Sequence, residues 1–91
     1  MIVSLEEMKQ YLRVDFDDDD VILEHLIMAA EQLCMDIVRT DDVASFAKEP
    51  NSRIAVMYAV AYQYEHREDA DHHALTLSLR SLLFGSRREG F

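Results

Sequence analysis

Residues 17–38 read DDDDVILEHLIMAAEQLCMDIV, and this stretch decides the fold. Its apolar residues recur at the spacing of one helix face, at Leu23, Leu26, Ile27, Ala30, Cys34 and Ile37. The aspartates before them suit a helix start, because the helix dipole favours negative charge there. Asp17 is the expected N-cap, with Phe16 and Val21 in the positions of a hydrophobic staple. The stretch therefore predicts one amphipathic helix about 30 Å long.

A shorter helix is predicted upstream, and a loop downstream. Ser4 and Glu7 have the spacing of a capping box, which predicts a first helix over residues 5–12. The periodicity lapses from residue 39 to residue 51, where polar residues and Pro50 indicate a loop. We expect three side chains to pin this loop to the core: Val43, Ala44 and Phe46.

The third predicted helix, over residues 52–66, is apolar nearly all round. A helix of this kind is either central in its domain or buried on two sides, one of them by a partner. We expect the edge formed by Val56, Val60 and Gln63, or the edge formed by Tyr58 and Tyr62, to contact another subunit. The predicted subunit interface is thus Val56, Tyr58, Val60, Tyr62 and Gln63.

A last helix is indicated by leucines at helical spacing, Leu75, Leu79, Leu82 and Leu83. It begins at Asp71 or Thr76 and ends before Gly85. The predicted fold is all-α, a compact bundle of about four helices with a short first helix, a long second helix and a flexible C-terminal tail. We expect a single domain over residues 1–85 and a tail over residues 86–91.

Charge is divided unevenly along the 91-residue chain, whose formal net charge is −9. Residues 1–46 hold 12 Asp and Glu against three Lys and Arg, whereas residues 47–91 hold six of each sign. Nucleic-acid binding needs cations that neutralise phosphates, so the first half is not expected to grip DNA. The longest apolar run, Ile54 to Tyr62, is nine residues, well short of the ~20 that a membrane helix needs.

Residues that could carry chemistry have structural explanations. The single Cys34 lies on the apolar helix face, which favours a buried residue in a reducing compartment, and two Gly leave no phosphate-binding loop. Asp15, Asp17 and Asp19 match the first positions of an EF-hand, but position 6 is not Gly and position 12 is not Glu. The remaining candidates fit no metal-site spacing and suggest a solvated loop: His66, His72 and His73. We expect no enzyme, no metal and no cofactor.

The order of these signals is similar to that of a known family. It resembles the small head-tail connector (adaptor) proteins of long-tailed bacteriophages, and the resemblance covers nearly the whole chain. The segments that carry it are residues 3–15, residues 19–23, residues 26–30, residues 59–68, and Leu82-Leu83 followed by Arg87.

The resemblance implies a role in virion assembly at the head-tail junction, in a protein made in the cytoplasm of the bacterial host. It implies a homo-oligomeric ring of about a dozen subunits on the portal protein, extending the DNA channel toward a downstream tail-side connector protein. DNA would pass through without specific binding, and no membrane is involved. We further expect the tail to dock on the portal through Arg87, Arg88 and Phe91. The alternative is an acidic helical regulator, an anti-repressor or DNA mimic, that binds a single protein partner.

Overall fold

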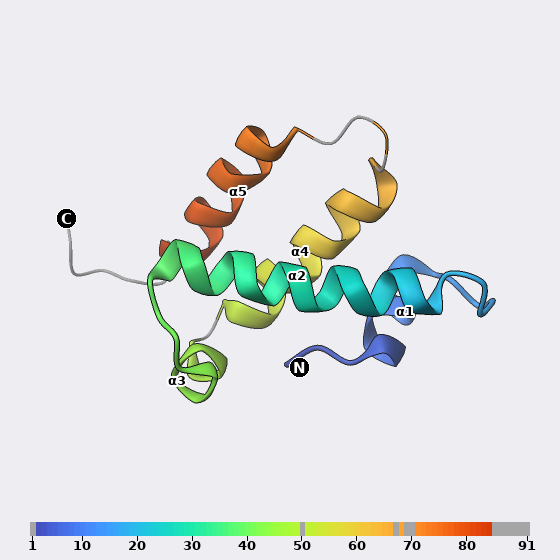
Figure 1. Ribbon diagram of the computed structural model, residues 1–91, viewed down its shortest axis with the longest axis horizontal. Coiled ribbons are helices and arrows are strands. Elements are labelled where there is room, and N and C mark those ends of the chain that lie inside the picture. The colour runs from blue at the N-terminus through green and yellow to red at the C-terminus, as the bar shows by residue number, and fades with distance from the viewer. Residues whose placement is uncertain (1, 50, 67, 69–70, 85–91) are drawn as a thin grey trace.

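The computed structural model describes residues 2–49, 51–66, 68 and 71–84, and in these ranges it contains helices and no strand. The helices are α1 (Leu5–Leu12), α2 (Asp20–Val38), α3 (Val43–Lys48), α4 (Ser52–Glu65) and α5 (His72–Phe84) (Figure 1). The all-α bundle predicted from the sequence is confirmed, with one short helix more than the four expected.

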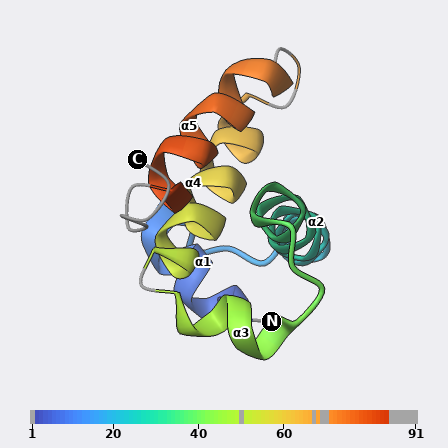
Figure 2. The ribbon, with the colours of Figure 1, turned by 90° about the vertical axis from the view of Figure 1, so that its left-hand side faces the viewer.

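The helices form two layers. The long helix α2 lies on one side, and α4 lies on the other with α5 and α1 beside it (Figure 2). Between the layers is a single core of fully or almost fully buried side chains. Its members from α2 and α4 are Leu23, Ile27, Ala30, Cys34, Met35, Ala55, Val56, Ala59 and Val60. Most of the face predicted for the long helix is thus buried, because those residues recur at the helical period.

The start of α1 is the one predicted. The Ser4 hydroxyl accepts a hydrogen bond from the Glu7 backbone N–H at 3.0 Å, and the Glu7 carboxylate accepts one from the Ser4 N–H at 3.0 Å. These two bonds satisfy backbone donors that a helix start leaves unpaired. Arg13 ends the helix in the left-handed conformation at φ 61°.

The start of α2 differs from the prediction. The helix begins at Asp20, and its N-cap is Asp19, whose side chain makes no capping hydrogen bond. Asp17, the predicted N-cap, instead pairs with Lys9 of α1; the Lys9 ammonium lies 2.8 Å from a carboxylate oxygen of Asp17 and of Asp20. A cation on a neighbouring helix thus engages the aspartates that the sequence pattern assigned to capping.

Two further segments correct or complete the sequence prediction. Part of the predicted loop is the helix α3, capped by Asp42, whose carboxylate accepts hydrogen bonds from Ala44 and Ser45. Phe46 is buried as expected, but Val43 and Ala44 are exposed and do not pin the segment. The last helix begins at the earlier of its two candidate starts, where the Asp71 carboxylate accepts from the Ala74 N–H.

Candidate assembly surfaces

The two sides of α4 have different environments. Ala55, Val56, Ala59 and Val60 face the core and are fully buried. Val56 and Val60 were predicted to contact another subunit, but the chain's own helices already cover them. Gln63 follows on the same side, three residues after Val60, and is half-buried. The interface prediction is therefore revised to the other edge, that of Tyr58 and Tyr62.

The outer face of α4 is apolar: Ile54 and Tyr58 are exposed there, and Met57 and Ala61 beside them are partly buried and also pack against the core. Ile54 is 55% exposed and Tyr58 37% exposed. With 3.6 residues per turn, these positions fall roughly opposite Ala55 and Val56. Single exposed apolar residues are common on soluble proteins, but a continuous stripe is typical of a contact surface.

A groove of about 520 Å³ adjoins the outer face of α4. We call it the tyrosine groove. Three of its lining residues come from the end of α1 and five from the last turns of α4: Tyr11, Leu12, Arg13, Tyr58, Ala61, Tyr62, Glu65 and His66. Aromatic side chains provide large apolar area with few rotatable bonds, and they are enriched at protein interfaces. The groove is thus suited to an apolar side chain of another protein.

One wall of the tyrosine groove is held in place by contacts within the chain. The rings of Tyr62 and His66 stack with their centroids 4.4 Å apart, and the Tyr62 hydroxyl accepts a hydrogen bond from the Asp71 N–H at 2.9 Å. His66, predicted in a solvated loop, is thus half-buried at the end of α4, whereas His72 and His73 are exposed in the first turn of α5. These contacts order the wall before a partner arrives, which lowers the entropy lost on binding.

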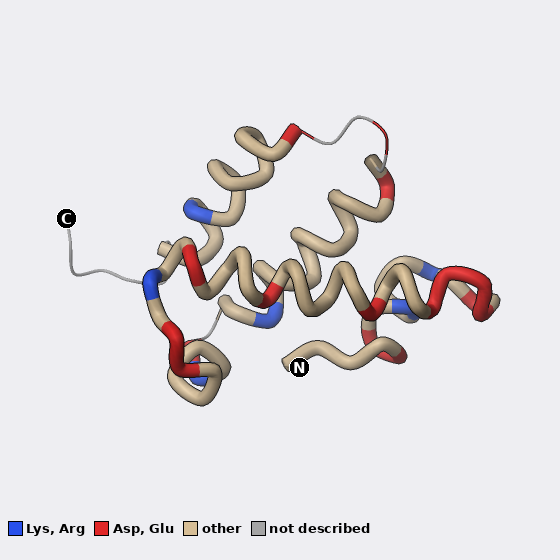
Figure 3. Tube along the Cα trace, viewed as in Figure 1, with Lys and Arg blue, Asp and Glu red and all other residues tan. Residues whose placement is uncertain are grey.

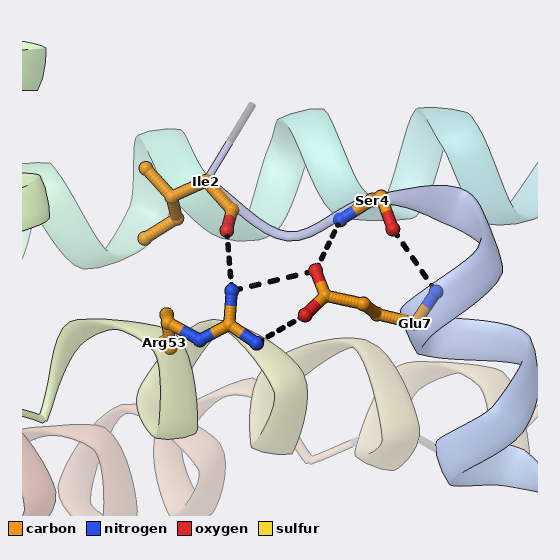
Figure 4. Close-up of polar contacts among 4 residues, drawn as sticks. All are labelled: Ile2, Ser4, Glu7 and Arg53. Atoms are coloured by element: carbon orange, nitrogen blue, oxygen red, sulfur yellow. Dashed lines mark hydrogen bonds and ion pairs between the residues drawn. The ribbon is translucent and has the colours of Figure 1, made fainter.

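The other wall is the end of α1, and a polar network fastens this helix to α4 (Figure 4). The Arg53 guanidinium donates to the Ile2 carbonyl at 2.9 Å and also binds the Glu7 carboxylate. The hydrogen bond from Arg53, followed by the one from the Ser4 backbone, lowers the pKa of Glu7 to about 2. Glu7 therefore joins the capping box to α4, and together with the buried Val3 and Met8 it holds α1 beside the groove.

The outward side of α2 is a second candidate surface. Val21 is 64% exposed and Met28 54% exposed, and both lie away from the core residues of the same helix. This helix carries Asp20, Glu24, Glu31 and Asp36 but no Lys or Arg. Figure 3 shows the acidic positions along α2 and in the turn that precedes it. The surface thus combines exposed apolar side chains with negative charge.

Cys34 and the possible metal ligands among the described residues have environments that do not activate them. Burial raises the pKa of the Cys34 thiol to about 12, so Cys34 is protonated at neutral pH and is a poor nucleophile. Within the described ranges, no cluster of three or more His, Cys, Asp and Glu could hold a metal ion. In the same ranges, no helix has the length and hydropathy to cross a bilayer.

The family model of the phage gp6-like head-tail connector proteins matches residues 2–88. The chain belongs to this connector family. The family is structural and non-enzymatic. As a member of it, the protein interacts with proteins of the phage head and tail and is located in the virion. The family match gives no support to the alternative hypothesis, an acidic regulator. Neither the curated proteins nor the solved structures provide a significant match.

Three predicted contact residues of the connector, Arg87, Arg88 and Phe91, lie outside the described residues, as does Gly85. Their docking on the portal stays a prediction from the sequence. The tyrosine groove was not predicted as a site. Tyr58 and Tyr62 were named because of their spacing, but Tyr11 and Arg13 are distant in sequence, and only the fold brings them beside α4.

Proposed function

We propose that this connector forms a ring of about a dozen subunits on the portal vertex of the DNA-filled head. There it extends the DNA channel and presents a surface for the next tail-side protein. Membership of the connector family supports the location at the head-tail junction. The observation that carries the ring is the outer face of α4, an apolar stripe with Ile54 and Tyr58 exposed beside the tyrosine groove.

A ring requires a contact between two different surfaces of the same chain. Such a heterologous contact closes into a ring when its rotation divides the circle evenly. The connector has exposed apolar residues on both of its layers, on α2 and on α4. Burying both in a neighbour would also stabilise a domain whose own core is small, so the melting temperature should rise with assembly.

The charge of the connector suits a channel through which DNA passes without being held. The first 46 residues have a net charge of −9, and carboxylates repel the phosphates of passing DNA. Where this acidic half lines or flanks the channel, it gives the DNA no specific binding site. The portal protein and the tail-side connector protein remain the expected protein partners.

Size-exclusion chromatography with light scattering tests the ring directly. We expect a monomer or weak association at low concentration and rings at high concentration or in the presence of the portal. A stable dimer, with no larger species under any of these conditions, would favour the acidic regulator and contradict the proposal.

The tail is proposed to attach the ring to the portal. Arg87 and Arg88 would pair with carboxylates and Phe91 would enter a pocket, a burial that contributes ~1.5–3 kcal/mol. Deleting residues 86–91 should leave the melting temperature nearly unchanged and abolish attachment to filled heads. Normal decoration of the portal vertex by the truncated protein in electron micrographs would refute the docking of the tail but leave the ring intact.

A further inference from the structure

We infer that the ring closes by a contact between opposite layers of neighbouring copies, in which Val21 and Met28 of α2 enter the tyrosine groove of the next copy. This inference rests on the proposed ring and names the two surfaces that form it. The occupant of the groove is thus a second copy of this chain.

The outward side of α2 has the form of a docking ridge. Val21, His25, Met28 and Gln32 are spaced at i, i+4, i+7 and i+11, so they lie along one side of the helix. All four are exposed, and Val21 has the largest exposed fraction of any large apolar side chain in the described residues. The core residues Leu23 and Ile27 lie on the other side of the helix. Nothing in the described part of the chain therefore covers this ridge.

The tyrosine groove lies in the other layer. It is formed by α4 and α1, which lie in the layer opposite α2 (Figure 2), and by helical spacing Tyr58 and Ala61 fall opposite the core residues Ala55 and Val56 of α4. The ridge and the groove thus lie on opposite sides of one domain. Two such surfaces cannot meet within a single copy, but they meet when copies are arranged head to tail. A single type of contact then buries both apolar surfaces in every copy of a closed ring.

The chemistry of the two surfaces is complementary. Methionine is flexible enough to fill an irregular groove, and its sulfur makes favourable contacts with aromatic rings such as those of Tyr11 and Tyr58. Glu24 lies one turn from both Val21 and Met28 and is exposed. The groove lining holds one carboxylate, Glu65, and one guanidinium, Arg13; both are exposed, and Arg13 has no ion pair within the described residues. Insertion of the ridge would give Glu24 and Arg13 partners of opposite charge.

Two single variants test the contact from its two sides. Met28→Glu puts a charge on the ridge, and Tyr58→Glu puts one in the groove; both positions are exposed, so the fold should tolerate them. Each variant should raise the concentration at which rings form about tenfold or more. The matched control is Leu77→Glu on α5, an apolar residue that is 53% exposed and belongs to neither surface. The control should form rings like the wild type, and circular dichroism should show all three folded.

Mixing the variants identifies the geometry. Copies with Met28→Glu keep an intact groove, and copies with Tyr58→Glu keep an intact ridge, so a mixture should form one-to-one pairs and nothing larger. Light scattering measures the mass of the species that the mixed variants form, both without heads and in the presence of portal-bearing heads. Charge exchange gives an independent reading: Arg13→Glu and Glu24→Arg should each weaken assembly, and the double variant should restore it.

The outcomes separate this inference from the ring itself. Normal rings with Met28→Glu would overturn the ridge, and normal rings with Tyr58→Glu that fail to attach to heads would show that a head protein occupies the groove. Either result refutes the inference and leaves the ring standing. Wild-type protein that never exceeds a dimer, with or without portal, would refute the ring and the inference together.

Discussion

The core between α2 and α4 and the N-terminal segment of residues 2–13 differ in how much polar contacts contribute to holding them in place. The core consists of fully buried apolar side chains, whereas the N-terminal segment joins two fully buried side chains, Val3 and Met8, to an exposed polar network in which Glu7 and Arg53 take part. Burial of apolar side chains is worth a few kcal/mol each and is insensitive to pH, whereas exposed ion pairs are worth little.

This difference has a functional consequence, because the end of α1 forms one wall of the tyrosine groove. The core determines whether the domain folds, and the polar network, beside the buried Val3 and Met8, helps to position the end of α1 that carries Tyr11 and Arg13. Changes in the network should therefore affect assembly more than they affect the free energy of unfolding. The following changes test this division.

The largest effect is expected in the core. Ile27→Ala removes a fully buried side chain and should lower the free energy of unfolding by ~2–5 kcal/mol. The neighbouring Met28→Ala, at a position that is 54% exposed, should change it by less than about 0.5 kcal/mol. Urea denaturation of both variants measures the contrast. A neutral Ile27→Ala would mean that the core face of α2 is misassigned.

A smaller effect is expected at the start of α1. Ser4→Ala removes the cap and should cost about 1 kcal/mol, together with a loss of ring formation that exceeds this destabilisation. Asp17→Ala should lower the free energy of unfolding by less than Ser4→Ala does, because the Asp17 carboxylate is exposed and caps no helix. If the two variants lower the free energy of unfolding by equal amounts, Asp17 acts as a capping residue after all.

The smallest effect concerns pH. Because Arg53 and the Ser4 backbone lower the pKa of Glu7 from 4.5 to about 2, the folded state binds this proton less readily than the unfolded state. The stabilisation from Glu7 is thus fully present above pH 4.5 and is lost as the pH falls toward 2. Glu7→Gln should make the stability of the protein less dependent on pH in this range. An unchanged acid-unfolding profile would show that Arg53 does not hold Glu7 in solution.

The sequence predicted the features that depend on neighbours within one helix. The capping box of Ser4 and Glu7 spans three residues, and the buried face of α2 follows from its period, so both were predicted correctly. The prediction that Asp17 caps α2 was wrong because this aspartate pairs with Lys9, which lies eight residues earlier on α1. The helix α3 was missed because its six residues are too few for a periodic pattern.

The candidate surfaces were predicted less well. Spacing identified Tyr58 and Tyr62, but it could not decide which edge of an apolar helix faces its own core, and Val56 and Val60 proved to be buried. That choice depends on where α2 and α5 pack, which is a property of the tertiary structure. The left-handed end of α1 at Arg13 sets another part of the groove, and no glycine or asparagine in the sequence signalled it.

Cryo-electron microscopy of DNA-filled, portal-bearing heads that lack the connector, incubated with the purified protein, is the most direct test of its proposed function. The proposed function predicts a ring of extra density on the portal vertex, coaxial with the DNA channel, and the proposed contact between ridge and groove predicts that α2 of each copy contacts α4 of the next. Bare portal vertices at saturating protein concentration would contradict it.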